Sequence, residues 1–115
     1  MVRYNTEAKY TEKKMFDGAG KARMRLILES NAEMYDKGRV FNHLFLDPGC
    51  EVGWHIHHGD GETYYILKGH GEYNDNGTAV RVGPGDVTFV DDGEGHSLKN
   101  TGDEPLEAIA LILFK

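Results

Sequence analysis

The sequence predicts an all-β protein folded as a sandwich or a barrel. Short apolar or alternating segments of about strand length recur along the chain. Turn-forming residues separate these segments at intervals of roughly 8 to 12 residues, the spacing typical of all-β folds. Only Thr6–Met15 resembles a short helix, and its periodicity is weak. Periodicity alone does not distinguish a sandwich from a barrel.

The expected strands follow one another along the chain. They span Ala22–Leu28, Val40–Leu46, Glu62–Lys68, Val80–Val82, Asp86–Val90, Ser97–Asn100 and Leu106–Phe114. Segments such as Asp47-Pro48-Gly49 and Gly83-Pro84-Gly85 favour turns between them. Asn76-Gly77 is the strongest hairpin signal, because both residues tolerate the positive φ angles of primed turns.

The final expected strand differs from the others in its two-sided apolar character. Most of Leu106–Phe114 is apolar on both faces. Such a pattern indicates a strand that is covered on each side. One of these covers could be a second subunit, and we expect a homodimer formed through edge strands.

The length of 115 residues fits one domain with a single core. We expect this domain to span residues 1–115, with its core at about 22–114 and residues 1–20 as an added strand or arm. Apolar residues make up 39% of the chain, and the 15 glycines indicate many tight turns.

Composition also bears on location and partners. The sequence contains neither a membrane-spanning apolar stretch nor a secretory signal, so we expect a cytoplasmic protein with no membrane partner. The single cysteine, Cys50, agrees with a reducing compartment. A net charge of −6 and 13 scattered basic residues argue against nucleic acid as a partner.

Three histidines and one glutamate form the most informative pattern. His55 and His57 are separated by one residue, so on a strand both imidazoles project from the same face. The residues His58–Gly61 read as a turn, and the resulting hairpin would bring Glu62 back toward both histidines. His96 follows a second glycine-bounded turn and could supply a fourth ligand from elsewhere in the barrel.

Imidazole and carboxylate ligands suit one divalent ion such as Fe, Mn, Ni, Co or Zn. Three neutral histidines and one carboxylate leave about one positive charge on the dication. An octahedral ion would retain two open positions for water, dioxygen or a small chelating anion. We expect no site for an organic cofactor, since neither Gly69-His70-Gly71 nor Gly83-Pro84-Gly85 precedes a helix that could hold a phosphate.

The spacing of these residues resembles the first motif of the cupin family. That motif consists of a glycine, five residues, His-x-His, three or four residues, a glutamate, six residues and a glycine. Gly49, His55, His57, Glu62 and Gly69 fill its positions.

A second stretch resembles the second cupin motif. The motif is a glycine, five residues, Pro-x-Gly, two residues, a histidine, three residues and an asparagine. Gly85, Gly93, His96 and Asn100 match it, and Asp91 stands at the usual proline position. Losing this proline removes a preset φ angle at a turn and leaves the metal ligands in place.

The resemblance implies a double-stranded β-helix, or jelly-roll barrel. It also implies, residue by residue, that the metal ligands are His55, His57, Glu62 and His96. Cupins include dioxygenases, decarboxylases, isomerases, lyases, storage proteins and sensing domains, so the family indicates the metal site better than the reaction.

Other residues are candidates for supporting roles. His43 is expected to face the cavity in one interpretation, and His43 and Tyr64 are the nearest candidates for proton transfer. Tyr64, Ile66 and Leu98 share strand faces with the ligands, so they are expected as pocket walls or as ordinary core. Trp54 is expected to pack on the opposite face or at a dimer contact.

The remaining histidines and two arginines have simpler interpretations. His58 is expected in a loop and His70 in solvent. Arg23 and Arg25 lie on one face of an early strand, where they either reach an anionic substrate or form a solvated face.

Two functions remain open from the sequence. The first is a metal-dependent enzyme, such as a dioxygenase or other oxidoreductase, a decarboxylase or an isomerase. It would act on a small anionic or enolisable metabolite, a carboxylate, sugar acid or diketone, chelated to the metal. The alternative is a non-catalytic module that binds or senses a small molecule.

Overall fold

The computed structural model describes residues 1–115 and contains ten strands. They are β1 (Tyr10–Lys13), β2 (Ala22–Leu26), β3 (Gly38–Leu46), β4 (Glu51–Ile56), β5 (Asp60–Lys68), β6 (Gly71–Asp75), β7 (Thr78–Val82), β8 (Val87–Val90), β9 (Gly95–Asn100) and β10 (Leu106–Phe114). The helices are two three-residue 3-10 turns, η1 (Asn5–Glu7) and η2 (Ala32–Met34). Neither is long enough to span a membrane.

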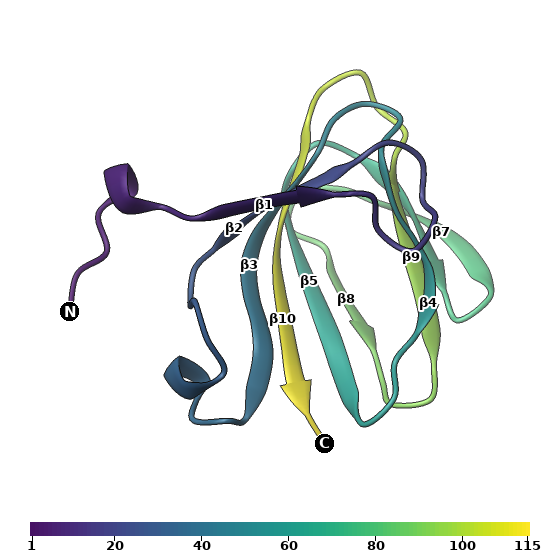
Figure 1. The fold of residues 1–115 in the computed structure, drawn as a ribbon. Coiled ribbons are helices and arrows are strands. Elements are labelled where there is room, and N and C mark those ends of the chain that lie inside the picture. The colour runs from purple at the N-terminus through teal and green to yellow at the C-terminus, as the bar shows by residue number, and fades with distance from the viewer.

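The strands form two antiparallel sheets that face each other (Figure 1). The six-stranded sheet has the order β1-β2-β3-β10-β5-β8, and the four-stranded sheet has the order β4-β9-β6-β7. Consecutive strands in the sequence often lie in different sheets, which rolls the chain into a barrel. The all-β fold class predicted from the sequence is therefore confirmed.

The hydrophobic core lies between the sheets because alternate residues of each strand point inward. Twelve buried residues form it: Ala22, Leu44, Leu46, Val52, Tyr64, Ile66, Tyr73, Val82, Leu98, Leu106, Ala108 and Ala110. Seven of the observed strands overlap the segments that alternation predicts. Buried polar residues, among them His57, Glu62 and His96, lie between the sheets as well.

Residues Thr6–Met15, whose helical periodicity is weak, contain the end of η1 and the strand β1. One expectation about local structure is wrong. β4 and β5 do not form a hairpin: they belong to opposite sheets, and residues 57–59 cross between them. Gly59 supports this crossing with a φ of 78°, a conformation that glycine adopts without strain.

The N-terminal residues add the edge strand β1 to the six-stranded sheet and then cross to β4. β1 pairs with β2, and the chain then turns at Phe16 and Asp17, which have φ angles of 52° and 58°. Beyond this turn the chain crosses β4 with Gly18 against Gly53. A Cβ atom on Gly18 would lie 2.7 Å from the amide nitrogen of Gly53, so the two segments touch backbone to backbone.

Candidate metal centre

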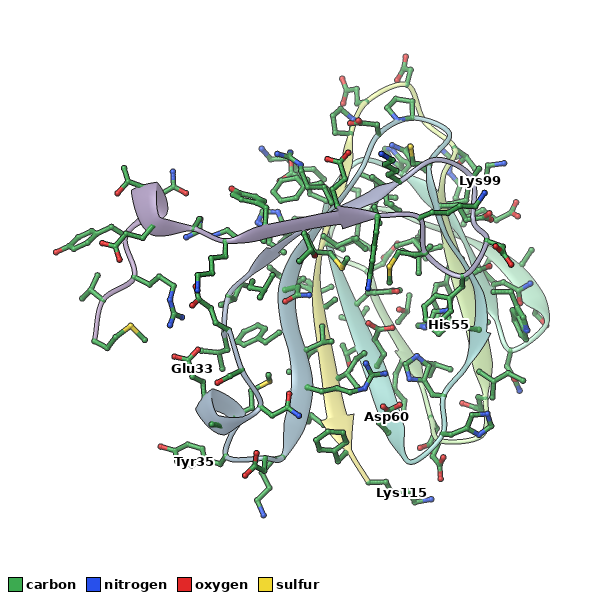
Figure 2. The ribbon with its side chains drawn as sticks, viewed as in Figure 1. Glu33, Tyr35, His55, Asp60, Lys99 and Lys115 are labelled. Atoms are coloured by element: carbon green, nitrogen blue, oxygen red, sulfur yellow. The ribbon has the colours of Figure 1, made fainter.

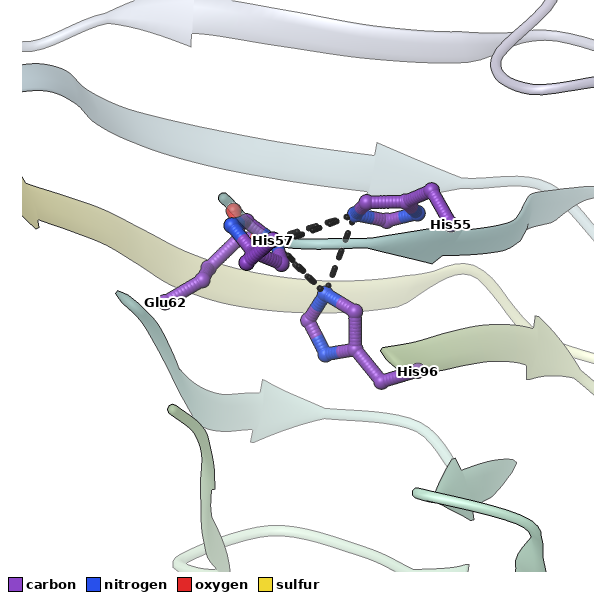
Figure 3. A group of neighbouring side chains, drawn as sticks. All are labelled: His55, His57, Glu62 and His96. Atoms are coloured by element: carbon purple, nitrogen blue, oxygen red, sulfur yellow. Dashed lines mark hydrogen bonds and ion pairs between the residues drawn. The ribbon is translucent and has the colours of Figure 1, made fainter. Parts of the chain in front are cut away.

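Four side chains from separate segments converge between the two sheets (Figure 3). His55 lies on β4, and His57 lies in the crossing that follows it. Glu62 points inward from β5 in the opposite sheet, and His96 lies on β9. The pairing of His55 with His96 across β4 and β9 places these two imidazoles side by side.

The ligand atoms of the four residues all lie within 4.8 Å of one another. The Nε2 atoms of the three histidines form a nearly equilateral triangle, with sides of 3.1 Å for His55–His57, 3.2 Å for His57–His96 and 3.1 Å for His96–His55. The Oε1 atom of Glu62 lies 3.0 Å from His96 Nε2, 3.4 Å from His57 Nε2 and 3.8 Å from His55 Nε2.

The opposite nitrogen of each imidazole has its own hydrogen-bond partner. His55 Nδ1 donates to the carbonyl oxygen of Gly53 at 2.8 Å, and His57 Nδ1 donates to Asp60 Oδ1 at 2.6 Å. His96 Nδ1 lies 2.8 Å from the hydroxyl of Tyr73. The carbonyl and the carboxylate place the proton of His55 and His57 on Nδ1, and the Tyr73 hydroxyl can accept from His96 Nδ1 in the same way. In this tautomer each neutral imidazole turns an Nε2 lone pair toward the centre.

The electrostatics of the cluster favour an ionised glutamate. Burial opposes ionisation of Glu62, but the contacts with His55, His57 and His96, whose Nε2 atoms donate to the carboxylate when the imidazoles are protonated, outweigh it and hold the pKa of Glu62 well below its usual range. The hydrogen bond to Glu62 raises the pKa of His57 against the effect of burial. Burial instead lowers the pKa of His96.

This donor set fits a single divalent cation. Three lone pairs and a carboxylate oxygen face one another, and the cluster contains no thiolate, so it suits a borderline divalent ion. Ligands about 2.1 Å from one ion lie about 3.0 Å apart when adjacent in an octahedron and about 4.2 Å apart when opposite. The observed distances resemble this pattern, with Glu62 nearest to the position opposite His55.

Two of the residues that orient the imidazoles are absent from the sequence-based expectations. Asp60 is buried and binds His57 through Oδ1, while its Oδ2 accepts a hydrogen bond from Arg39 Nε at 2.8 Å. Tyr73, also buried, lies against His96 from β6. Figure 2 shows Asp60 between the sheets, close to the crossing that carries His57. The position of Asp60 three residues after His57 is the only sequence signal for this role.

A cavity of about 260 Å³ opens beside the cluster. His55, His57 and Glu62 line it, whereas His96 does not, so the cavity lies on the side of the cluster away from His96. Tyr64 also lines it, with its ring stacked on His96 at a centroid distance of 5.2 Å.

The N-terminal segment closes part of this cavity. Thr11, Lys13, Met15 and Phe16 contribute to its wall. The ring of Phe16 stacks on His55 with a centroid distance of 3.9 Å and an interplanar angle of 12°. Residues well before the predicted core therefore form part of the site.

His43 lies outside the cavity, contrary to one sequence-based interpretation. Its ring is on the outer face of β3, where Nε2 lies 2.9 Å from Glu107 Oε1 and the ring stacks on Phe45. Asn42 and Leu44 face inward instead. Because both faces of this strand are largely apolar, the alternation did not reveal which face is covered by the barrel.

The other candidate residues also have defined positions. Ile66 and Leu98 belong to the core and do not line the cavity, so the pocket-wall interpretation holds only for Tyr64. Trp54 is partly exposed with its ring against Gly95, and His58 and His70 are exposed.

Arg23 and Arg25 both lie away from the cavity. The guanidinium of Arg23 lies over the rings of Tyr10 and Phe45, at 5.4 and 4.5 Å from their centroids. Arg25 donates to Asn5 Oδ1 at 2.8 Å. These contacts leave neither guanidinium in the cavity wall.

The chain is thus a two-sheet antiparallel β-barrel that encloses three histidines and a glutamate, a potential metal site. The model of the cupin domain family matches residues 42–112, and the chain belongs to this family. The matched range contains all four clustered residues and excludes the N-terminal segment.

The chain is also similar to proteins from Thermotoga maritima. It is 46% identical over 100 residues to an oxalate-binding protein, covering 87% of this chain and 82% of the relative. The crystal structure of a predicted oxalate decarboxylase from the same organism superposes with a TM-score of 0.93 and 41% identity over 100% of both chains.

A more distant structural similarity concerns the fold alone. The polyketide cyclase RemF from Streptomyces resistomycificus is 18% identical, with a TM-score of 0.76 over 99% of this chain and 79% of its own.

Proposed function

We propose that this cupin binds one divalent metal ion on His55, His57, Glu62 and His96 and, at that ion, a small chelating carboxylate such as oxalate. The observation that supports this function best is the convergence of three Nε2 atoms within 3.2 Å of one another beside Glu62 and next to a cavity. The similarity to an oxalate-binding protein supports oxalate as the first ligand to test.

The arrangement of ligands suits a bidentate anion. His55, His57 and Glu62 would hold the ion at the cavity wall, and His96 would hold it from the far side of the cluster. An ion held there would face the cavity, where both oxygens of a chelating carboxylate could reach it. A dication with one carboxylate ligand keeps a positive charge that attracts an anion.

Turnover of the chelated ligand is a second candidate function. A bound ion would act as a Lewis acid toward the carboxylate oxygens. Tyr64 supports this candidate, because its ring lines the cavity and burial raises the pKa of its hydroxyl well above the ordinary value, so the group stays protonated. A protonated phenol at this place could hold or donate a proton to the ligand.

The test compares two neighbouring histidines. Protein loaded with Co²⁺ or Mn²⁺ should bind both the metal and oxalate in a calorimeter, and His57→Ala should lose both. His58→Ala is the matched control, since His58 is the exposed neighbour of His57. Stoichiometric metal in His57→Ala would contradict the ligand assignment.

A second measurement separates binding from turnover. Oxalate, 2-oxo acids and diketones are incubated with the loaded protein, while carbon dioxide, formate and oxygen uptake are followed. Product formation that is lost in Tyr64→Phe supports an enzyme. Tight binding with no product supports a binding module.

We also propose a homodimer in the cytoplasm. The outer face of the six-stranded sheet supports the dimer, because Tyr65, Val87, Phe89 and Leu113 are apolar and 46 to 64% exposed there, next to the edge strand β8. The single free cysteine supports the location. Light scattering should give twice the chain mass, and Phe89→Asp should give a monomer. A monomeric unaltered protein would contradict the dimer.

A further inference from the structure

The cavity beside the metal cluster is lined by two chemically different sets of side chains. One set is His55, His57 and Glu62. The other set is aliphatic, and we call it the aliphatic wall. It consists of Met24, Leu26, Leu28, Val40, Leu44 and Ile112. A ligand that reaches the cluster through this cavity therefore lies against hydrocarbon along part of its length.

Part of the aliphatic wall is left uncovered, although Met24 and Val40 pack against the hydrophobic core. Leu44 and Ile112 are buried by neighbouring strands. Leu26 and Leu28, in contrast, face the cavity but are only half-buried. Uncovered apolar side chains in a concave site are typical of surfaces that bind the apolar part of a ligand.

The charged groups that line the cavity lie outside the aliphatic wall, and the polar side chain within it, between Val40 and Leu44, is the neutral amide of Asn42. Glu29 lies at the rim and pairs with Arg3 at 3.1 Å and with Lys9 at 3.4 Å. Arg39 is held by Asp60 at 2.8 Å. No charged group of the lining projects from among the wall residues of β2 and β3 between Met24 and Leu28 or between Val40 and Leu44.

The size of the cavity also exceeds the needs of a bare chelating group. Its 260 Å³ lies just below the range of about 300–1,000 Å³ that small-molecule sites occupy. Oxalate consists of two joined carboxylates and has no hydrocarbon, so it would leave the aliphatic wall facing water. The wall is matched instead by a ligand that has both a chelating head and an apolar chain.

We propose that the preferred ligand is a 2-oxo carboxylate with a short hydrocarbon chain. Its carboxylate and oxo oxygens bind at the ion, and its chain covers Leu26, Leu28 and Val40. This inference rests on the proposed function, because the head group needs the metal. It narrows the ligand class from small chelating anions to those with an apolar substituent.

The test is a series of ligands that share one head group. Glyoxylate, pyruvate, 2-oxobutanoate, 2-oxopentanoate and 4-methyl-2-oxopentanoate are titrated into the unaltered Co²⁺-loaded protein, with oxalate as the bare chelator. Each added methylene that is buried should tighten Kd by about fourfold until the cavity is full. The heat-capacity change of binding should become more negative with chain length, which is the signature of apolar burial.

Two neighbouring variants locate the effect. Leu28→Ser should flatten the dependence of Kd on chain length and leave the affinity for oxalate unchanged. Ile27→Ser is the matched control, because Ile27 is also half-buried but does not line the cavity. Thermal unfolding of both variants checks that they fold, and the series on the unaltered protein needs no variant.

The outcomes separate this inference from the proposed function. Oxalate binding with no gain, or a loss, along the series overturns the inference and keeps the proposed function. Absence of binding for every ligand, oxalate included, overturns both. Tightening along the series that Leu28→Ser abolishes supports both.

Discussion

The Nδ1 atom of His57 lies 2.6 Å from the Oδ1 atom of Asp60, the shortest of the contacts that orient the three histidines. Asp60 is buried, and its other oxygen is held by Arg39. Hydrogen bonds from Arg39 and His57 lower the pKa of Asp60 although burial opposes them, so the carboxylate stays charged. This contact fixes both the tautomer and the direction of the imidazole.

We therefore expect Asp60→Ala to weaken metal binding by about 10- to 100-fold, as is typical when a carboxylate behind a ligating histidine is removed. Competition with a chromogenic chelator measures the affinity. Asp103→Ala, at an exposed loop position, should leave it unchanged. Equal affinities in all three proteins would show that Asp60 does not orient His57.

A second prediction concerns the hydroxyl of Tyr73. Burial raises the pKa of Tyr73 to about 12, so its phenol stays neutral beside His96. Tyr73→Phe keeps the ring but leaves the buried Nδ1 of His96 without its partner, which should cost about 1–3 kcal/mol in the free energy of unfolding. Urea denaturation measures this cost. Tyr35→Phe is the control, because Tyr35 is 86% exposed and should show no change.

Phe16 should control how fast the metal leaves the site. Its ring covers one face of His55 from the N-terminal segment. Phe16→Ala removes this cover, so release of the metal to excess EDTA should become several times faster. Phe114→Ala, which removes a ring of similar exposure elsewhere, should release metal at the unaltered rate. A slow release from Phe16→Ala would contradict the covering role.

As the pH is lowered, the metal affinity of this site should begin to fall at a higher pH than that of an ordinary histidine site. Only the neutral imidazole binds a cation, and the hydrogen bond to Glu62 raises the pKa of His57 above its ordinary value of 6.5. Protonation therefore begins to compete with the metal above pH 6.5 as the pH is lowered. The apparent Kd for the metal, measured at a series of pH values, gives the pH at which the affinity begins to fall. An apparent Kd that stays constant until well below pH 6.5 would contradict the raised pKa.

His57 has the opposite effect on the metal-free protein. A raised pKa in the folded state stabilises the fold fully below the unfolded value of about 6.5 and loses that contribution as pH rises through the folded pKa. The difference in unfolding free energy between the metal-free unaltered protein and His57→Gln should therefore shrink as pH rises. A difference that grows with pH would contradict this sign.

The core, and not the ion, should hold the barrel together. Leu98 is completely buried on β9, two residues from His96. Leu98→Ala should lower the unfolding free energy of the metal-free protein by about 2–5 kcal/mol. Leu67→Ala, at a partly exposed position on β5, should lower it much less. We expect His57→Ala to remain folded, and its unfolding without metal would contradict this view.

The sequence predicted the fold class and the joint position of His55 and His57 because both depend on local spacing, whereas His96, 34 residues beyond Glu62, was assigned through the resemblance to the cupin motifs. Alternating strands and the His-x-His pair are short-range patterns, and the turn glycines fix where the chain reverses. β6 was not predicted, since Asn74 and Asp75 at its end are typical of turns. β1 was predicted only as an added strand or arm within residues 1–20, without bounds, because a four-residue strand with every residue exposed has no apolar alternation.

The misplaced residue, His43, shows the limit of alternation. Placing His43 requires knowing which face of β3 the other sheet covers. Because the outer face also carries aromatic residues, apolar alternation does not identify that face. Phe16 and Tyr73 reach the cluster through contacts between distant strands. Such contacts depend on how the two sheets are packed, which periodicity does not specify.

Because Gly18 crosses directly over Gly53, the residues that form the N-terminal wall of the cavity can be exchanged while the segment keeps its place. Because the two backbones touch there, a side chain at either position would lift the segment away from β4. Thr11, Lys13, Met15 and Phe16 precede this fixed point and line the cavity, and none of them belongs to the buried core cluster. Protein engineers could thus re-line the pocket by exchanging these few residues, keeping both glycines as the anchor and leaving the barrel unaltered.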